Sequence, residues 1–112
     1  MTDIGDGIHL STAATRSWEP DLDVGGQGHL VLDDGVTTAG LWRAERGVPP
    51  APAAPVTIPQ RETIYVVSGR VRIGVDDRDT FDLGPGDMIS IPAGAAVGWD
   101  ATADCEVFWV YA

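Results

Sequence analysis

A run of alternating residues around Glu62 carries the strongest candidate for chemistry in the sequence. Within Glu62–Val67, Glu62 shares one strand face with Ile64 and Val66, whereas Tyr65 lies on the other face. If this face lines the interior of the fold, the carboxyl loses hydration among apolar side chains, so we expect a raised pKa and the capacity to act as a general acid or base. The alternative is a buried Glu that accepts hydrogen bonds from Arg or backbone and only fixes the strand. We favour the functional interpretation because buried carboxylates are uncommon.

Three polar residues near Glu62 are candidates for substrate contacts, namely Arg43, Gln60 and Tyr65. Gln60 shares parity with Glu62, whereas the parity of Tyr65 favours a rim or an interface. The sequence contains no Gly-rich phosphate loop, no Ser/His/Asp arrangement and no Cys pair for a metal. Its single cysteine, Cys105, lacks a His base and fits a small buried hydrophobe better than a nucleophile.

Short strands separated by turns must position these residues. β-branched and aromatic runs alternate with Gly, Pro and Asp, and no window sustains apolar residues at helical spacing. The sequence therefore predicts an all-β sandwich or barrel. The expected strands are His29–Leu32, Val36–Glu45, Glu62–Ser68, Val71–Val75, Thr80–Leu83, Met88–Ile91, Val97–Ala101 and Cys105–Tyr111.

The chain length fits one domain. Residues 1–28 are polar and Gly-rich and are interpreted as an N-terminal arm with one edge strand at most, and residues 29–112 as the barrel. The Pro-rich residues 48–55 are either a loop over the barrel mouth or a plain spacer. Because Glu62–Ser68 and Cys105–Tyr111 are largely apolar on both faces, we expect a homodimer that covers the outer face, including Tyr65.

The charge of the chain excludes several classes of partner. Among 112 residues the formal net charge is −10, and all seven basic residues are Arg. Such a surface repels phosphate backbones and anionic lipid, so we expect neither nucleic-acid nor membrane binding. No apolar run reaches the ~20 residues of a membrane span, and the first residues do not resemble a signal peptide. With a single cysteine, a cytoplasmic location is expected.

The second half of the sequence resembles the cupin superfamily. Glu62–Gly69 has a Glu, six residues and a Gly, and Gly86–Gly94 has a Gly, five residues and Pro-x-Gly. Gly40-Leu41-Trp42 and Gly98-Trp99 look most like the small single-domain branch related to ureidoglycine aminohydrolase and ethanolamine-utilisation cupins. The resemblance covers roughly residues 38–111 and implies a small jelly-roll β-barrel, but one fold hosts many chemistries.

The usual metal ligands of that superfamily are missing here. Its His-x-His pair would fall on Val56 and Ile58, or alternatively on Pro55 and Thr57, and its later His on Val97. Of the four ligand positions only Glu62 matches, and a lone carboxylate holds Fe, Ni, Cu or Zn poorly. His29 lies outside the motifs, and we prefer a surface or edge-strand role for it. We expect no bound first-row metal and no other cofactor.

Two tryptophans are candidates for substrate binding. Trp99 follows Val97 by two residues, so the resemblance directs it into the barrel, where an indole can stack on a planar or cationic ligand. Trp42 is a second candidate whose facing the sequence leaves open. Either residue alone is typical of a core, whereas two that converge on Glu62 would form a pocket.

These features favour a metal-independent cupin-type enzyme that acts on a small molecule. Glu62 would transfer a proton in an isomerase, cyclase, lyase or hydrolase-type step, with Trp42 and Trp99 positioning the substrate. The composition, without Lys or Asn, is typical of GC-rich bacterial genomes, where such cupins accompany biosynthetic or catabolic clusters. Two alternatives stay open, namely a non-catalytic small-molecule-binding or auxiliary cupin, and a metalloprotein with atypical ligands.

Overall fold

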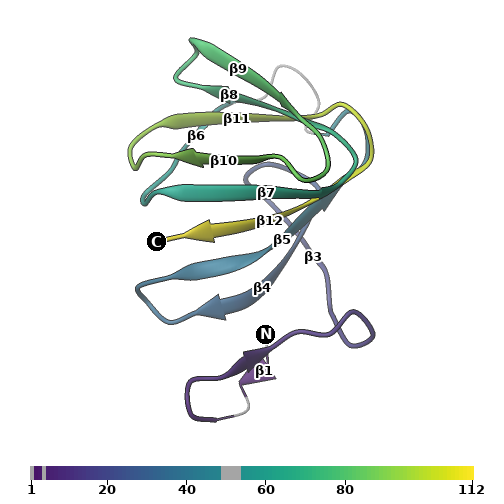
Figure 1. Ribbon diagram of the computed structural model, residues 1–112, viewed down its shortest axis with the longest axis vertical. Coiled ribbons are helices and arrows are strands. Elements are labelled where there is room, and N and C mark those ends of the chain that lie inside the picture. Colours follow the sequence, from purple (N-terminus) through teal and green to yellow (C-terminus); the bar gives the residue numbers. More distant parts are fainter. Residues whose placement is uncertain (1, 4, 49–53) are drawn as a thin grey trace.

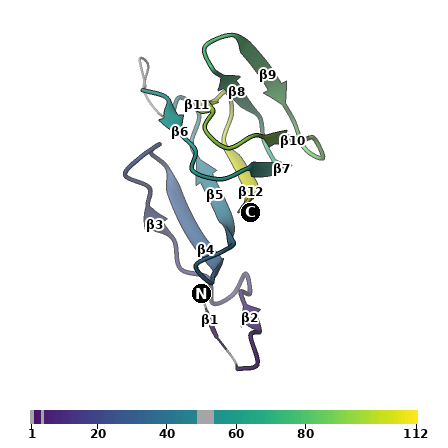
Figure 2. The same cartoon turned by 90° about the vertical axis from the view of Figure 1, so that its left-hand side faces the viewer.

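Two antiparallel sheets face each other and enclose the hydrophobic interior (Figures 1 and 2). The computed structural model describes residues 2–3, 5–48 and 54–112 and contains no helix within these ranges. The larger sheet has the order β10-β7-β12-β5-β4-β3, and the smaller has the order β6-β11-β8-β9. The bounds of these strands are β3 Glu19–Pro20, β4 Gln27–Asp33, β5 Thr38–Ala44, β6 Val56–Thr57, β7 Glu62–Ser68, β8 Val71–Val75, β9 Asp79–Leu83, β10 Met88–Ile91, β11 Ala96–Ala101 and β12 Cys105–Tyr111. The prediction of an all-β jelly-roll barrel is confirmed.

All eight strands expected from the sequence are present. Four of them, β7, β8, β10 and β12, have the expected bounds, and the ends of the others move by at most two residues. The sequence did not reveal β1 (Thr2–Asp3), β2 (His9–Leu10), β3 or β6. Each of these has only two residues, which is too short to show a hydrophobic period of its own.

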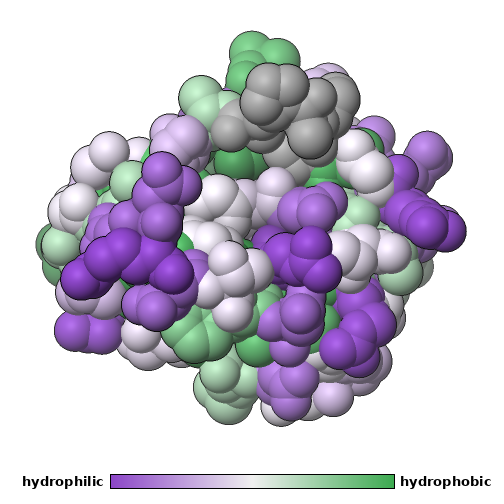
Figure 3. All heavy atoms as spheres, turned by 90° about the horizontal axis from the view of Figure 1, so that it is seen from above, coloured by the Kyte–Doolittle hydropathy of each residue, from purple (hydrophilic) through white to green (hydrophobic). Residues whose placement is uncertain are grey.

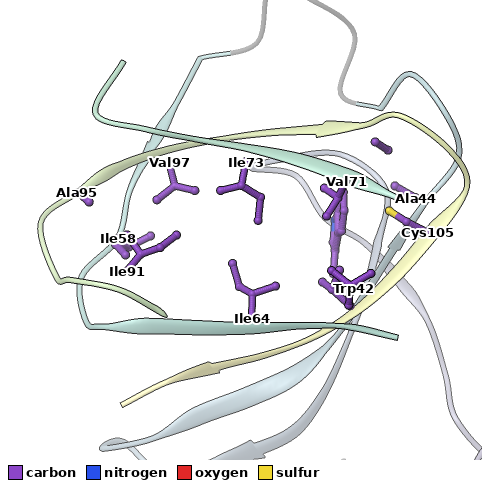
Figure 4. Close-up of a cluster of buried hydrophobic side chains, with 13 residues drawn as sticks. Trp42, Ala44, Ile58, Ile64, Val71, Ile73, Ile91, Ala95, Val97 and Cys105 are labelled. Atoms are coloured by element: carbon purple, nitrogen blue, oxygen red, sulfur yellow. The ribbon is translucent and has the colours of Figure 1, made fainter. Parts of the chain in front are cut away.

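Alternating side chains from both sheets fill the interior. In Figure 4, Ile64 of β7 points across the interior toward Ile73 of β8, and Trp42 lies at the same end as Cys105. Ile64, Ile73 and Val97 have no solvent exposure. Cys105 belongs to this cluster, where burial raises the pKa of its thiol, so it packs as a small hydrophobe. Burial of these side chains is the main stabilising contribution to the barrel.

The N-terminal arm folds back against the larger sheet. β1 and β2 form a hairpin at one end of the molecule, and β3 pairs with β4 as an edge strand (Figure 2). His29 of β4 fastens the arm, because its Nε2 lies 2.7 Å from Ser11 Oγ and its Nδ1 lies 2.9 Å from the Ser17 carbonyl oxygen. His29 is only 7% exposed. The expected surface position of His29 is therefore wrong, because the arm covers it, whereas β4 does lie at the edge of the sheet at this residue, since β3 pairs only with Gln27 and Gly28.

The face of the molecule seen in Figure 3 is mixed in polarity, and the whole chain carries a formal net charge of −10. Figure 3 shows hydrophilic side chains in separate groups, with hydrophobic groups between them. Within the described ranges, no helix is long and apolar enough to span a membrane.

The Pro-rich loop expected over the barrel mouth falls largely on residues 49–53, which lie outside the described residues.

Substituting Gly69 by Ala should destabilise the barrel more than the same change at Gly86. Both glycines have positive φ, +75° and +88°, so each substitution should cost about 1–2 kcal/mol in backbone strain. A Cβ at Gly69 would also overlap the Asp104 carbonyl oxygen, whereas one at Gly86 meets nothing within 4 Å. We expect Gly69→Ala to lose about 1–3 kcal/mol more in urea unfolding. Equal losses would contradict the close approach of the two turns.

Candidate functional site

Glu62 begins β7 and turns its carboxyl into the interior. It is 3% exposed and pairs directly with Tyr111 of β12, which accounts for the hydrogen bond from the Tyr111 hydroxyl to the carboxyl. The second carboxyl oxygen, Oε1, is buried and has no hydrogen-bond partner among the described residues. A buried acceptor without a partner is uncommon, because leaving it unpaired costs about 1–3 kcal/mol.

The surroundings of Glu62 favour its neutral form. Burial raises the pKa of Glu62 to about 7, and the hydrogen bond from Tyr111 opposes this only in part. Burial also raises the pKa of Tyr111, and the negative charge of Glu62 raises it further, so the phenol stays protonated. Near neutral pH, the Glu62 carboxyl can therefore either donate or accept a proton.

A cavity of about 220 Å³ lies beside Glu62. Apolar and aromatic side chains make up most of its wall, and two aspartates of the segment between β3 and β4 complete it. Its lining residues are Asp21, Asp23, Val24, Trp42, Val56, Ile58, Glu62, Trp99, Trp109 and Tyr111. The structure thus brings Glu62, Trp42 and Trp99 together around one space.

Two pairs of tilted rings shape the aromatic wall. Trp42 and Trp99 have centroids 5.2 Å apart with their planes at 52°, and Trp109 and Tyr111 have centroids 5.4 Å apart at 51°. Trp42 is held in place because its Nε1 donates to the Gly25 carbonyl oxygen at 2.8 Å. These contacts fix the rings before any ligand arrives.

Gly40 of β5 makes room for Trp109. The two residues are opposite each other in the β5–β12 register, and a Cβ at position 40 would lie 3.0 Å from Trp109 Cζ2 and overlap the His29 carbonyl. A glycine here lets the indole lie across the neighbouring strand. The Gly40-Leu41-Trp42 segment therefore shapes the cavity in two ways. Gly40 leaves space for the indole of Trp109, and Trp42 contributes its own indole to the wall.

Three residues expected to contact substrate do not line this cavity. Tyr65 is 40% exposed on the outer face of β7. Gln60 Nε2 instead donates to the Val36 carbonyl oxygen at 2.7 Å, although Gln60 shares parity with Glu62. Arg43 is exposed, with its Nε 2.8 Å from Gln27 Oε1 and its guanidinium 4.0 Å from the Trp18 ring centre.

Four polar or aromatic residues of the cavity wall, and Val24 beside them, were not predicted from the sequence. Trp109 and Tyr111 share a strand face with the buried Val107, so the alternation of the last strand could have predicted that both point inward. Asp21 and Asp23 gave no such signal. They reach the cavity because β3 pairs with β4, and a two-residue strand containing Pro20 has no detectable pattern.

The side chains around Glu62 do not fit the metal centre of typical cupins. The three positions expected for imidazole ligands carry the hydrocarbon side chains of Val56, Ile58 and Val97. Val97 is fully buried, and Val56 and Ile58 form part of the cavity wall. Within the described part of the chain, no three His, Cys, Asp or Glu side chains converge in a way that could hold a metal ion.

The sequence matches the family model of the EutQ-like cupin domain over residues 31–106. This chain belongs to the EutQ-like cupin family. The match spans β5 to β11 and includes Glu62, Trp42 and Trp99. The predicted resemblance to small ethanolamine-utilisation cupins is confirmed, and no curated protein matches the cupin.

Solved structures share the fold of this cupin at low sequence identity. A putative ethanolamine utilization protein Q from Salmonella typhimurium LT2 is 15% identical with a TM-score of 0.78, over 96% of this chain and 88% of that one. An RmlC-like cupin from Shewanella frigidimarina NCIMB 400 is 18% identical with a TM-score of 0.75, over 93% and 89%. Hydroxypropylphosphonic acid epoxidase from S. wedmorenis is 13% identical with a TM-score of 0.79, over 98% and 62%. At these identities the likeness shows the fold alone.

Replacing Glu62 by Gln should flatten the pH dependence of this cupin's stability. The pKa of Glu62 rises from 4.5 to about 7 on folding, so the folded state binds more protons between these values. Stability is therefore lost as the pH rises through that window, by roughly 3 kcal/mol in total. In urea unfolding, the wild type should lose about this much relative to Glu62→Gln between about pH 4.5 and about pH 8. Parallel curves would show that the carboxyl titrates as it does in water.

Proposed function

We propose that this cupin is an enzyme that transfers a proton to or from a small molecule through Glu62, without a metal ion. One observation carries the proposal: Oε1 of Glu62 is buried and unpartnered beside a cavity that is large enough for a small ligand. A concave, mostly apolar space with one poised carboxyl is the usual form of a small-molecule site.

The pKa of Glu62, about 7, suits both directions of proton transfer. General acid–base catalysis is most efficient when the pKa of the group lies near the working pH. Tyr111 restrains the carboxyl through its hydrogen bond, and the largely apolar wall leaves few polar groups near it. Isomerisation, cyclisation, elimination and hydrolysis all need such a proton shift and no external oxidant or reductant.

Two alternatives use the same residues differently. A non-catalytic binding or auxiliary cupin would hold the ligand in this cavity and use Glu62 only as an acceptor. A metalloprotein with atypical ligands would need Glu62 together with Asp21 or Asp23. These alternatives differ from the enzyme in their response to Glu62→Gln and to a chelator.

Loss of a titrating group at position 62 should abolish turnover. Wild type and Glu62→Gln are incubated with small-molecule extracts of GC-rich bacteria, and consumed compounds are followed by chromatography and mass spectrometry, which also detect isomers. We expect the wild type to consume at least one compound. The variant should consume the same compound at a rate lower by about 100-fold or more. Prior treatment of the wild type with a chelator should leave the rate unchanged.

Glu106→Gln is the matched control, because Glu106 lies on the opposite face of β12 and does not line the cavity. It should convert the compound at the wild-type rate. Equal rates of conversion by Glu62→Gln and the wild type would overturn the proposal that Glu62 catalyses proton transfer. A compound that both proteins retain and neither converts would support the binding protein, and chelator sensitivity would support the metalloprotein.

We also propose that the protein is a homodimer joined through the outer face of the larger sheet. The strand registers place Met88, Tyr65, Phe108 and Leu41 in one row across β10, β7, β12 and β5. Met88, Tyr65 and Phe108 are 64%, 40% and 36% exposed. A continuous apolar row on an open sheet face is typical of an interface between subunits.

A charge in the middle of this row should separate the subunits. Sedimentation at micromolar concentration is expected to show a dimer for the wild type and a monomer for Tyr65→Asp, because the interface would bury an unpaired carboxylate. Val36→Asp is the control, since Val36 is 72% exposed but lies outside the row, in the turn between β4 and β5. A monomeric wild type would contradict the dimer.

A further inference from the structure

We infer that the cavity beside Glu62 selects a small organic cation with an N–H group, that is, a protonated amine. This inference rests on the proposed function in one respect only, namely that the same cavity is the ligand site. It adds the chemical class of the ligand. Three independent features of the cavity carry it: the sign of its charges, the chemistry of its wall, and the unpaired acceptor at Glu62.

All ionisable side chains that line the cavity are acidic, apart from the phenol of Tyr111. They are Asp21, Asp23 and Glu62, and no Arg or His is among the described lining residues. Burial raises the pKa of Tyr111 most, and the charges of Glu62, Asp21 and Asp23 raise it further, so their negative field reaches the aromatic wall. An anionic ligand would be repelled from this space, whereas a cation would be attracted into it.

Four aromatic side chains line the cavity and are available to a cation. Trp42 and Trp99 form one tilted pair and Trp109 and Tyr111 form the other, so four electron-rich rings surround a space that a few heavy atoms can fill. Aromatic rings attract cations through their quadrupoles, with Trp the strongest. The cavity of about 220 Å³ equals about seven water volumes, so it suits a ligand smaller than a typical drug.

Glu62 distinguishes an N–H cation from a quaternary one. Its Oε1 is buried, unpartnered and, when ionised, can only accept hydrogen bonds. A protonated amine donates an N–H to this oxygen and neutralises the carboxylate, whereas a quaternary ammonium does only the second. A neutral alcohol can donate a hydrogen bond but leaves the buried charge uncompensated.

Binding should depend on pH through the groups that face the cavity. These are Glu62 from β7, Tyr111 from β12, and Asp21 and Asp23 from the segment between β3 and β4. A bound cation favours ionised Glu62, so affinity should fall as the pH decreases below about 7. Tyr111 stays protonated throughout, because its pKa is raised.

Three probes of equal chain length test the inference. Butylammonium, 1-butanol and butyrate are titrated into the full chain, and binding is followed by calorimetry and by the indole signals of Trp42, Trp99 and Trp109. We expect butylammonium to bind about tenfold or more tightly than 1-butanol, and butyrate not to bind. Tetramethylammonium should bind more weakly than butylammonium, since it has no N–H to donate.

Variants test the residues. Glu62→Gln should weaken butylammonium binding about tenfold or more and leave 1-butanol unchanged, while Glu106→Gln on the outer face should change neither. Asp23→Asn should weaken butylammonium binding by about two- to threefold at low salt and less at high salt, because Asp23 is exposed. If Glu62→Gln fails to fold, the wild type must still lose butylammonium affinity, and not 1-butanol affinity, between about pH 8 and about pH 5.5.

The outcomes separate this inference from the proposed enzyme. Equal affinities for butylammonium and 1-butanol, or tighter binding of butyrate, would overturn the cation selectivity, even if Glu62-dependent turnover is found in extracts. Selective butylammonium binding together with turnover that does not depend on Glu62 would overturn the proposed catalytic role of Glu62. The inferred cation selectivity of the cavity would then still hold. Butylammonium binding that shifts no indole signal of the cavity would also overturn the inference, because the cation would then lie elsewhere.

Discussion

The burial of one carboxyl group in an apolar barrel is the constraint on which the site depends. Glu62 occupies an interior position that the alternation of β7 otherwise fills with Ile64 and Val66, both fully buried. Removing a carboxylate from water costs several kcal/mol, on the order of the total stability of a small domain. The protein reduces this cost in two ways, through the hydrogen bond from Tyr111 and through proton uptake near neutral pH. The second way leaves a carboxyl whose pKa of about 7 lies near neutral pH, and the proposed proton transfer would use this property.

The barrel supplies this position through strand register rather than through loops. Tyr111 is opposite Glu62, Trp109 is opposite both Ile64 and Gly40, and Trp42 lies on β5 next to them. Strand pairing fixes the backbone positions from which these side chains project. Sites built on such rigid elements are held more precisely than sites built on loops. The arm contributes the remaining wall. Its attachment through His29 on the outer face and through β3 at the edge brings Asp21 and Asp23 to the cavity.

The sequence predicted the barrel and its eight longer strands because turn chemistry and period-two alternation are local signals. Through the cupin resemblance it also predicted that Glu62 and Trp99 point into the barrel. It predicted an N-terminal arm with one edge strand at most, but it did not locate the two-residue strands β1, β2 and β3, each of which depends on its pairing partner. The positions of the Gln60 and Arg43 side chains could not be predicted from the sequence for a related reason. Each side chain is directed by a distant partner, the Val36 carbonyl for Gln60 and Trp18 with Gln27 for Arg43, and spacing along the chain reveals neither.

The charges in the cavity suggest why hydrocarbon side chains can occupy the positions that typical cupins give to imidazole. In a metal-binding relative, the ion would compensate the charge of the glutamate. Here Val56, Ile58 and Val97 provide no ligands, and no described cationic side chain lines the cavity, so Glu62 has no fixed counter-charge. Its compensation must come from something that can enter and leave, either a proton or a cationic ligand. Both compete for the same oxygen, and a pKa of about 7 means that neither excludes the other near neutral pH. At this position, proton binding and the binding of the proposed cation would be thermodynamically linked, because both involve the same carboxyl.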